Sequence, residues 1–243
     1  MLALTRGSLR ATLIDLDGTL LETAPDLAYA ANRVRAEFGL PDLPVERIAQ
    51  FIGKGTDVLL HRSLTNDLEG RVAEEKFVPA KALFERQYRD VNGSRSRVFD
   101  RVPLALSLLR EAGLRVGCVT NKPREFTMTL LERTGLLPGL DAVLAGDDVA
   151  RRKPHPDLLL AACTQLRVAP AATLLIGDSE NDVQAAQAAG CACLLVETGY
   201  NEGEPVQSLA DEAGVGGVFP TLFEAVQWVL QSGLPQQRAP IHS

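Results

Sequence analysis

Two carboxylates stand where a buried strand should end. In the stretch "ATLIDLDGTLLET", apolar residues run from Ala11 to Ile14, and Asp15 and Asp17 follow directly. Polar groups follow other apolar runs further along the chain: Thr120 and Asn121 after "VGCV", Lys153 in "RRKPHPD", and Asp178 and Asp182 after "LLIG". Carboxylates, a hydroxyl and an ammonium group gathered in one place would suit a cation and an anionic substrate.

These residue types suit the transfer of a phosphoryl group. Asp15, Asp17 and Asp178 would repel one another unless a cation lies among them, and carboxylate oxygens are ligands that Mg²⁺ prefers. The hydroxyl of Thr120 and the charge of Lys153 suit the oxygens of a phosphoryl group. One aspartate can attack phosphorus while a second protonates the leaving alcohol and then activates water. Asp15 and Asp17 fit these two roles.

Each of these groups alone has an ordinary structural explanation. Asp17 with Gly18 is typical of a turn. Asp178 or Ser179 could cap the helix that follows, and Lys153 could be a solvated surface lysine. Separate structural explanations do not account for why several polar groups each stand at the end of a strand-like run. We therefore interpret them as parts of one site.

A pattern of short strands and helices determines where these groups lie. Apolar runs bounded by turn formers predict strands; they are "ATLIDLD", "LRVGCVTN", "AVLAGDD", "TLLIGDS", "CACLLVET" and a weaker "GGVFP". Helix-like stretches separate them, at 103–112, 124–135, 155–167 and 179–190. This alternation predicts an α/β fold with a doubly wound parallel sheet, which binds ligands at the carboxyl ends of its strands.

The segment after the first strand departs from this alternation. It shows no clear strand, and its apolar residues recur at helical spacing, as in "TAPDLAYAANRVRAEFG", where Thr23 is expected to cap a helix with Pro25 in its first turn. We predict an all-helical insert between the linkers "LET" and "NGSRSR". The predicted division is a core of residues 1–21 and 95–233, a helical cap of residues 22–94, and a disordered tail of residues 234–243.

The composition restricts the partners and the compartment. The chain of 243 residues carries 25 basic and 31 acidic side chains and no basic tract, which argues against nucleic acid or a membrane surface as a partner. No apolar run approaches the ~20 residues of a membrane span, and the start resembles no signal peptide. The four cysteines are expected to be reduced and mostly buried. We expect a cytoplasmic protein, a monomer or small homo-oligomer, that acts on a small molecule.

The motifs together resemble those of a known superfamily. "DLDGTLLET", "VTNKP", "RRKPHPD" and "GDSENDVQAA" are similar, in order, to the four motifs of haloacid-dehalogenase-superfamily phosphatases, which have a Rossmann-like core and a helical cap. Further stretches, "ETAPDLA", "FIGKGTDVLL" and "ETGYNEGEPV", resemble bacterial phosphoglycolate phosphatases in particular. The resemblance implies Mg²⁺-dependent hydrolysis of 2-phosphoglycolate to glycolate and phosphate through an aspartyl-phosphate. A phosphatase or mutase that acts on a sugar phosphate shares the cap type and remains the alternative.

The resemblance also implies a role for each candidate residue. Asp15 is similar to the nucleophile, which is also a metal ligand, and Asp17 to the general acid and base, with its backbone carbonyl on the metal. Asp178 resembles the third metal ligand, and Asp182 a carboxylate that orients metal-bound water or Lys153. The residues that resemble the phosphate-binding group are Thr120, Asn121 and Lys153.

The loop "FIGKGTD" in the helical insert resembles a loop that reaches over the site and senses the leaving group. Lys54 in this loop could pair with the carboxylate of 2-phosphoglycolate, or it could be an ordinary solvated lysine, and both interpretations stay open. The loop resembles a nucleotide P-loop only faintly, because it lacks the earlier glycine and follows a helix-like stretch. A catalytically idle binding protein on the same fold is disfavoured, because all four motifs keep their charged residues.

Overall fold

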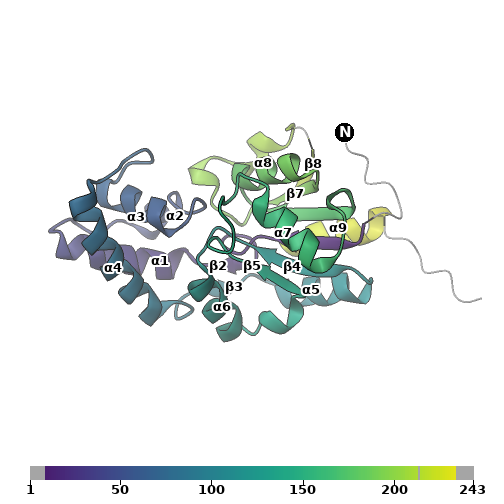
Figure 1. The fold of residues 1–243 in the computed structure, drawn as a ribbon, viewed down its shortest axis with the longest axis horizontal. Coiled ribbons are helices and arrows are strands. Elements are labelled where there is room, and N and C mark those ends of the chain that lie inside the picture. The colour runs from purple at the N-terminus through teal and green to yellow at the C-terminus, as the bar shows by residue number, and fades with distance from the viewer. Residues whose placement is uncertain (1–8, 213, 234–243) are drawn as a thin grey trace, which may run out of the picture.

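A six-stranded parallel sheet forms the centre of the protein (Figure 1). The computed structural model describes residues 9–212 and 214–233. The strand order across the sheet is β5-β4-β1-β6-β7-β8, and each neighbouring pair is parallel. The strands are β1 (Ala11–Ile14), β4 (Arg115–Val119), β5 (Ala142–Leu144), β6 (Thr173–Gly177), β7 (Ala192–Val196) and β8 (Val215–Phe219). They coincide with the runs that the sequence predicts as strands.

Helices cover both faces of this sheet, which explains why its strands are continuous apolar runs. In β1, Leu13 faces one helical layer and Ile14 the other, and both side chains are fully buried. One layer contains α5 (Val102–Glu111), α6 (Arg124–Arg133) and α9 (Leu222–Gly233), and the other contains α7 (Asp157–Leu166) and α8 (Glu180–Ala189). The predicted doubly wound α/β fold is confirmed.

The order of the strands brings the ends of β1, β4 and β6 together. The chain runs from β1 to β4 and β5 on one side, and then crosses back to β6, β7 and β8 on the other side of β1. Ile14 of β1 is in register with Cys118 of β4 and with Ile176 of β6. Because the strands are parallel, their carboxyl ends lie at one edge, and the point where the strand order reverses is where such sheets bind ligands.

Four helices inserted after the first strand form a cap with an apolar centre of its own. They are α1 (Ala24–Glu37), α2 (Val45–Ala49), α3 (Thr56–Thr65) and α4 (Glu74–Val91), and Figure 1 shows them together, in purple and blue, beyond one end of the sheet. Their buried side chains include Leu27, Phe51, Leu60, Phe84 and Tyr88. The chain therefore has the helical cap that the sequence predicts, while the residue boundaries of the two domains stay a prediction.

A short pair of strands lies where the cap joins the core. β2 (Leu21–Glu22) pairs antiparallel with β3 (Arg97–Val98). Strands of two residues are too short to show an alternation of polar and apolar side chains. The expectation that the segment after the first strand contains no strand is therefore wrong at Leu21 and Glu22, and β3, which lies beyond that segment, was not predicted.

The first cap helix begins in a way that the sequence did not reveal. Thr23 precedes α1 and Pro25 lies in the first turn, but the Thr23 side chain makes no capping hydrogen bond. The hydroxyl oxygen of Tyr200 instead accepts hydrogen bonds from the backbone N–H groups of Thr23 at 2.9 Å and Ala24 at 3.1 Å. The predicted Thr23 cap is therefore wrong, because a distant core residue satisfies the first donors of the helix.

Three further predictions concern the cysteines, the membrane and the tail. The four cysteines are free and buried, as expected. Within residues 9–212 and 214–233, no helix has the length and apolar character to cross a bilayer. The predicted disordered tail, 234–243, lies outside the described residues. Single turns of 3₁₀ helix complete the described elements: η1 (Leu137–Gly139), η2 (Pro170–Ala172), η3 (Asn201–Gly203) and η4 (Val206–Leu209).

Candidate active site

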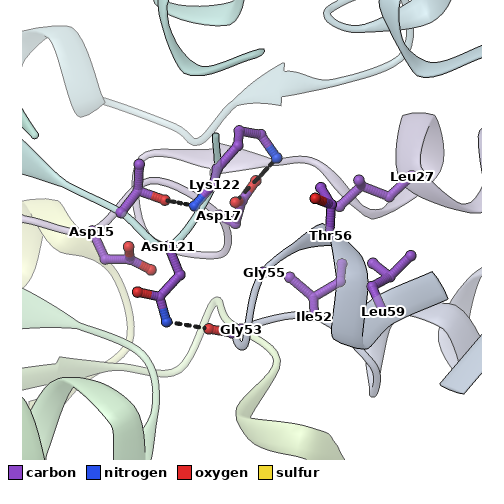
Figure 2. A pocket seen from close by; sticks show the side chains of 11 residues that line it. Asp15, Asp17, Leu27, Ile52, Gly53, Gly55, Thr56, Leu59, Asn121 and Lys122 are labelled. Carbon is purple, nitrogen blue, oxygen red and sulfur yellow. Dashed lines mark hydrogen bonds and ion pairs between the residues drawn. The ribbon is translucent and has the colours of Figure 1, made fainter. Parts of the chain in front are cut away.

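Three parallel strands deliver the predicted residues to one place. Asp15 directly follows β1, Thr120 directly follows β4, and Asp178 directly follows β6. All three side chains are buried. Asp15 and Thr120 line a cavity between the sheet edge and the cap, and Figure 2 shows Asp15 at this cavity. The structure thus brings these residues together, and their roles in turnover stay predictions.

Lys153 reaches the same place from the loop after β5. Its Nζ lies 2.7 Å from Asp15 Oδ1 and 2.7 Å from Asp182 Oδ1, and it donates to the carbonyl oxygen of Val119 at 3.1 Å. The side chain is 3% exposed. Burial disfavours the charged ammonium, but the carboxylates of Asp15 and Asp182 outweigh burial and raise the pKa of Lys153 above its ordinary value. Lys153 is therefore a fixed buried charge and not a surface lysine.

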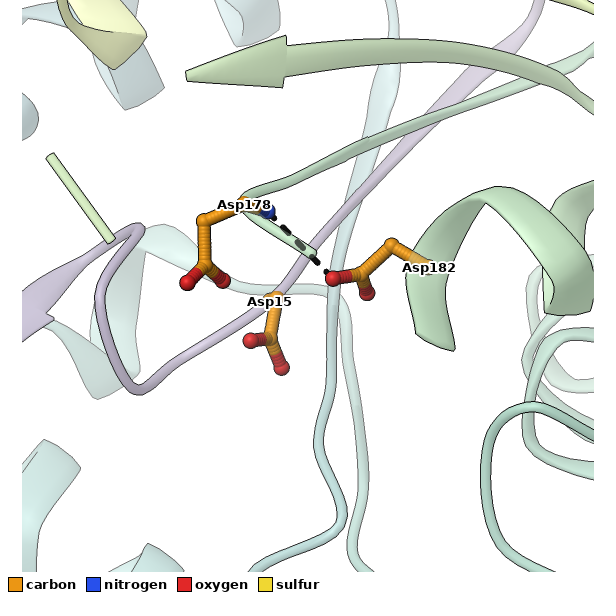
Figure 3. Close-up of side chains that lie close together, drawn as sticks. All are labelled: Asp15, Asp178 and Asp182. Atoms are coloured by element: carbon orange, nitrogen blue, oxygen red, sulfur yellow. Dashed lines mark hydrogen bonds between the residues drawn. The ribbon is translucent and has the colours of Figure 1, made fainter. Parts of the chain in front are cut away.

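Asp15, Asp178 and Asp182 form a cluster of buried carboxylates (Figure 3). One oxygen from each lies within 4.8 Å of the others. Burial raises the pKa of Asp15 to about 6, although Lys153 lowers it, and Asp182 adds to the rise. Burial also raises the pKa of Asp178 well above its ordinary value, and the charges of Asp15 and Asp182 raise it further. The negative charge here therefore exceeds what Lys153 compensates.

Asp15 and Asp178 fit a divalent cation. Carboxylate oxygens are the donors that Mg²⁺ takes, and a cation would relieve the repulsion between the two groups. Asp15 Oδ1 is held by Lys153, and Oδ2 makes no hydrogen bond within the described residues. Asp178 accepts hydrogen bonds from Thr19 Oγ1 at 3.2 Å and from the N–H of Tyr200 at 2.8 Å, which fix its orientation. These two residues could therefore hold a metal ion.

Asp182 is a weaker candidate for a direct metal ligand than Asp178, because one of its oxygens pairs with an ammonium group and the other accepts three hydrogen bonds, whereas each Asp178 oxygen accepts one. Oδ1 pairs with Lys153. Oδ2 accepts hydrogen bonds from Ser179 Oγ at 2.8 Å and from the backbone N–H groups of Ser179 at 3.2 Å and Asp178 at 3.3 Å. Ser179 and Asp182 form a capping box at the start of α8. Asp182 thus orients Lys153 and the Asp178 loop together, which is the kind of contact that the resemblance implies.

Two glycines allow the backbone to approach Asp178 closely. Gly18 has a φ of +92°, a conformation that favours glycine, and a Cβ there would lie 2.7 Å from Asp178 Oδ2. A Cβ on Gly199 would lie 1.9 Å from the same oxygen. Any larger residue at either position would displace this carboxylate. The turn at Asp17-Gly18 is therefore present, and it also shapes the site.

Asp17 is paired with a lysine to which the sequence pattern assigned no role. Lys122 Nζ lies 2.8 Å from Asp17 Oδ1 and 3.1 Å from Oδ2, and its side chain is 2% exposed. The ring of Tyr88, from α4 of the cap, lies 5.1 Å from this ammonium, in the range of a cation–π contact. Burial disfavours the charge of Lys122, yet Asp17 raises its pKa above the ordinary value. "VTNKP" contains Lys122, but no spacing signal links it to Asp17.

Thr120 and Asn121 differ in what they offer to a substrate. Thr120 Oγ1 accepts a hydrogen bond from the N–H of Lys122 at 3.2 Å, so its own hydrogen can be donated into the cavity. Asn121 Nδ2 donates to the carbonyl oxygens of Lys153 and Gly53, both at 2.9 Å. Asn121 Oδ1 accepts from the N–H of Lys153 at 2.9 Å. The Asn121 amide thus connects the Lys153 loop to the cap.

The cap closes the site opposite the sheet. Thr56, the first residue of α3, is 8% exposed, and its hydroxyl lies on the Asp17 side in Figure 2, without a hydrogen-bond partner in the described part of the chain. The cavity measures about 30 Å³, which is room for ~2 water molecules. The apolar wall on the cap side consists of Leu27, Ile52 and Leu59.

Lys54 is not among the residues that line this cavity. Its ammonium forms an ion pair with Glu202 Oε1 at 2.8 Å. Glu202 belongs to η3, in the loop after β7. Gly53 and Gly55, the neighbours of Lys54, do line the cavity. The predicted contact between Lys54 and a substrate carboxylate therefore requires Lys54 to leave Glu202.

Comparisons with known proteins match both the motifs and the fold. Residues 12–196 match the family described as haloacid dehalogenase-like hydrolase. The chain belongs to this family. A phosphoglycolate phosphatase of Nitrosospira multiformis is 44% identical over 224 residues, which are 92% of this chain and 97% of that protein. A phosphoglycolate phosphatase of Escherichia coli is 38% identical over 214 residues, 82% of this chain and 85% of that protein.

A solved structure supports the same family at the level of the fold. The crystal structure of a predicted phosphoglycolate phosphatase from Haemophilus somnus is similar to this chain with a TM-score of 0.82 and 29% identity. The similarity covers 90% of this chain and 97% of that one. The resemblance drawn from the four motifs and the predicted core with a helical cap are thus confirmed.

Proposed function

We propose that this protein is a phosphomonoesterase that hydrolyses 2-phosphoglycolate to glycolate and phosphate through an aspartyl-phosphate on Asp15. The observation that carries the proposal is the geometry of Asp15 in the cavity between cap and core. Lys153 holds Oδ1, so Oδ2 is left to attack phosphorus. The relatives named phosphoglycolate phosphatase, which match most of the chain, support the same activity here.

The proposed cofactor is Mg²⁺. We assign its protein ligands to the carboxylates of Asp15 and Asp178 and, from the resemblance, to the backbone carbonyl of Asp17. When bound, the ion supplies positive charge that screens the anionic nucleophile from the anionic phosphate. The crowding of buried carboxylates that raises the pKa of Asp15 and Asp178 supports this assignment.

In the first proposed step, Asp15 Oδ2 bonds to phosphorus and the bond between phosphorus and the leaving oxygen breaks. The hydroxyl of Thr120 donates a hydrogen bond to a phosphoryl oxygen, and Lys153, whose three N–H groups are already paired, exchanges one of these bonds for another phosphoryl oxygen. Asp17 gives its proton to the leaving oxygen, so the alcohol departs neutral. Asp15, Asp17 and Thr120 line one cavity, and Lys153 contacts Asp15, which supports the assignment.

In the second proposed step, water attacks phosphorus and the bond to Asp15 breaks. Asp17, now a carboxylate, takes the proton from the attacking water, and phosphate leaves. The ion pair between Asp17 and Lys122 supports this half of the cycle, because Lys122 stabilises Asp17 as a carboxylate. Lys122 therefore pairs with the Asp17 carboxylate in the interval between the departure of the alcohol and the attack of water.

The size and the lining of the cavity favour a small leaving group. A cavity of about 30 Å³ must expand for any phosphoester, and a short leaving group requires the least expansion. The hydroxyl of Thr56, which has no partner among residues 9–212 and 214–233, and the ammonium of Lys122 are two cavity groups that could meet a carboxylate on the leaving group. A sugar phosphate remains the alternative substrate, and its leaving group would have to displace the apolar cap wall.

The test is phosphate release from a panel of phosphoesters with Mg²⁺ and with EDTA. The panel contains 2-phosphoglycolate, glucose and fructose phosphates, nucleoside monophosphates and pyrophosphate. We expect the highest kcat/KM for 2-phosphoglycolate and no turnover in EDTA. A sugar phosphate with the highest kcat/KM would contradict the substrate and leave the chemistry intact.

Two substitutions separate the chemistry from the recognition of the leaving group. Asp15→Asn should lower kcat by several orders of magnitude in a folded protein, because the nucleophile acts as part of a unit. Thr56→Val should raise KM for 2-phosphoglycolate more than for p-nitrophenyl phosphate, which lacks the carboxylate. Near-normal turnover of Asp15→Asn would refute the mechanism. The four free, buried thiols suit the reducing cytoplasm, where we propose that the enzyme works.

A further inference from the structure

A buried arginine of the cap has its carboxylate partner in the core. The side chain of Arg62, on α3, is 3% exposed, and its Nη1 donates to Glu202 Oε1 at 2.7 Å. Its Nε is buried without a hydrogen-bond partner in the described part of the chain. A buried charge that loses its partner is strongly destabilising. The charge of Arg62 is therefore well compensated while the cap contacts the core. When the two separate, this charge is poorly compensated unless water reaches it.

Lys54 binds the same carboxylate from the loop that covers the cavity. Its Nζ lies 2.8 Å from Glu202 Oε1, the oxygen that also accepts from Arg62. Burial alone would raise the pKa of Glu202, but its hydrogen bonds with Lys54 and Arg62 lower the pKa, so the group is ionised. Gly53 and Gly55, on either side of Lys54, line the cavity. The ion pair thus fixes the covering loop over the site.

The loop that carries Glu202 is anchored to the core and to the base of the cap. Tyr200 donates its N–H to Asp178, and its hydroxyl oxygen accepts from the start of α1. Thr198 Oγ1 donates to the carbonyl oxygen of Gly18 at 2.7 Å. Glu202 itself has a φ of +54°, a conformation that residues other than glycine rarely adopt. The anchored loop thus holds the backbone of Glu202 in an unfavourable conformation, and in this conformation the carboxylate contacts both cap cations.

We propose that Glu202 is a positioning residue that holds the cap closed over the active site. In the closed form, Glu202 compensates Arg62 and Lys54, and in the open form water must solvate both cations. The cavity between cap and core has room for ~2 water molecules, so a phosphoester needs the cap to move away from the core. Glu202 therefore sets the balance between a closed form that excludes water and an open form that admits substrate. The open form also presents two cations that attract an anionic substrate.

The test measures the distance between cap and core directly. The four native thiols are buried, so spin labels can be placed on cysteines introduced at Asp67 in the cap and Gln165 in the core, both of which are exposed. We expect Glu202→Gln to raise the open-to-closed ratio by about tenfold or more, because Arg62 loses its compensating charge. The control is Glu204→Gln, an exposed acid two positions away without an ion pair among the described residues. It should keep the wild-type distribution of distances.

Further variants distinguish an electrostatic latch from a general structural role. Glu202→Asp keeps the charge and should preserve more of the closed form than Glu202→Gln. Lys54→Met removes the more exposed cation and leaves Arg62 paired, so the ratio should rise by only about two- to fivefold. In a protein that lacks both cations, Lys54→Met with Arg62→Met, adding Glu202→Gln should have no further effect.

The proposal would be overturned by a wild-type distance distribution for Glu202→Gln, or by an equal effect of Glu202→Gln with and without the two cations. If Glu202→Gln does not fold, Lys54→Met decides the question, and an unchanged ratio would count against the latch. The measurement needs no turnover, so its outcome is independent of the proposed phosphatase activity.

Discussion

Replacing Lys153 by methionine tests whether a buried cation holds the carboxylate cluster together. The Lys153 ammonium lies 2.7 Å from both Asp15 and Asp182, and its side chain is 3% exposed. Methionine fills much of the volume of the lysine stem and removes the charge, which leaves two buried acids uncompensated. Removal of one partner from a buried ion pair costs about 3–5 kcal/mol. At about 2–4 °C per kcal/mol for a chain of this size, Tm should fall by about 6–20 °C in EDTA.

The matched control is Lys81→Met, which makes the same chemical change at an exposed ion pair. Lys81 Nζ lies 2.9 Å from Asp57 Oδ2, but the two side chains are 40% and 39% exposed. Such a pair contributes about 0–1 kcal/mol, so Tm should change by at most a few degrees. Both variants are measured by thermal unfolding in EDTA. Equal Tm shifts for the two variants would refute the argument that the Lys153 ion pairs stabilise the protein more because they are buried.

Two further predictions use the same assay. Mg²⁺ at about 100 times its Kd should stabilise the wild type by about 2.7 kcal/mol, and Asp178→Asn should lose most of this gain; a full gain in Asp178→Asn would exclude Asp178 as a ligand. Asp26 is fully buried and accepts hydrogen bonds from the N–H groups of Gly93, Arg95 and Ser96 and from Ser96 Oγ. Asp26→Asn should therefore lower the free energy of unfolding by about 3 kcal/mol. The control Asp100→Asn, at an exposed position, should leave Tm almost unchanged. Similar Tm shifts for the two variants would contradict the claim that these hydrogen bonds hold the end of the cap.

The sheet and the strand-end residues could be predicted because each depends on a local pattern. Both faces of the sheet are covered, so its strands appear as continuous apolar runs. Asp15, Thr120 and Asp178 each stand one residue after such a run. Parallel strands then bring the three groups to one edge without further information. Lys153, from the loop after β5, and Asp182, from the first turn of α8, meet at the same edge.

The elements that sequence reasoning missed fall into two kinds. β2 and β3 have two residues each, too few to show a period. The helix α9 is different, because Leu222, Phe223, Val226 and Val229 are buried on one helix of clear apolar spacing, and the pattern was open to prediction. The capping of α1 was not open to prediction for a further reason, since Tyr200 lies 177 positions from Thr23.

The partners of the charged residues were the least predictable part of the site. Lys122 and Asp17 are 105 positions apart and Arg62 and Glu202 are 140 apart, so no spacing rule connects either pair. Lys54 was proposed to meet a substrate carboxylate because its loop resembles one that senses the leaving group, with a solvated lysine as the alternative, whereas the fold pairs it with Glu202. Such pairs can be recognised once the structure shows which cations are buried, because a buried cation without an acid would be destabilising. The same rule argues that Arg62, which looks like an ordinary helical arginine in the sequence, depends on contact between cap and core.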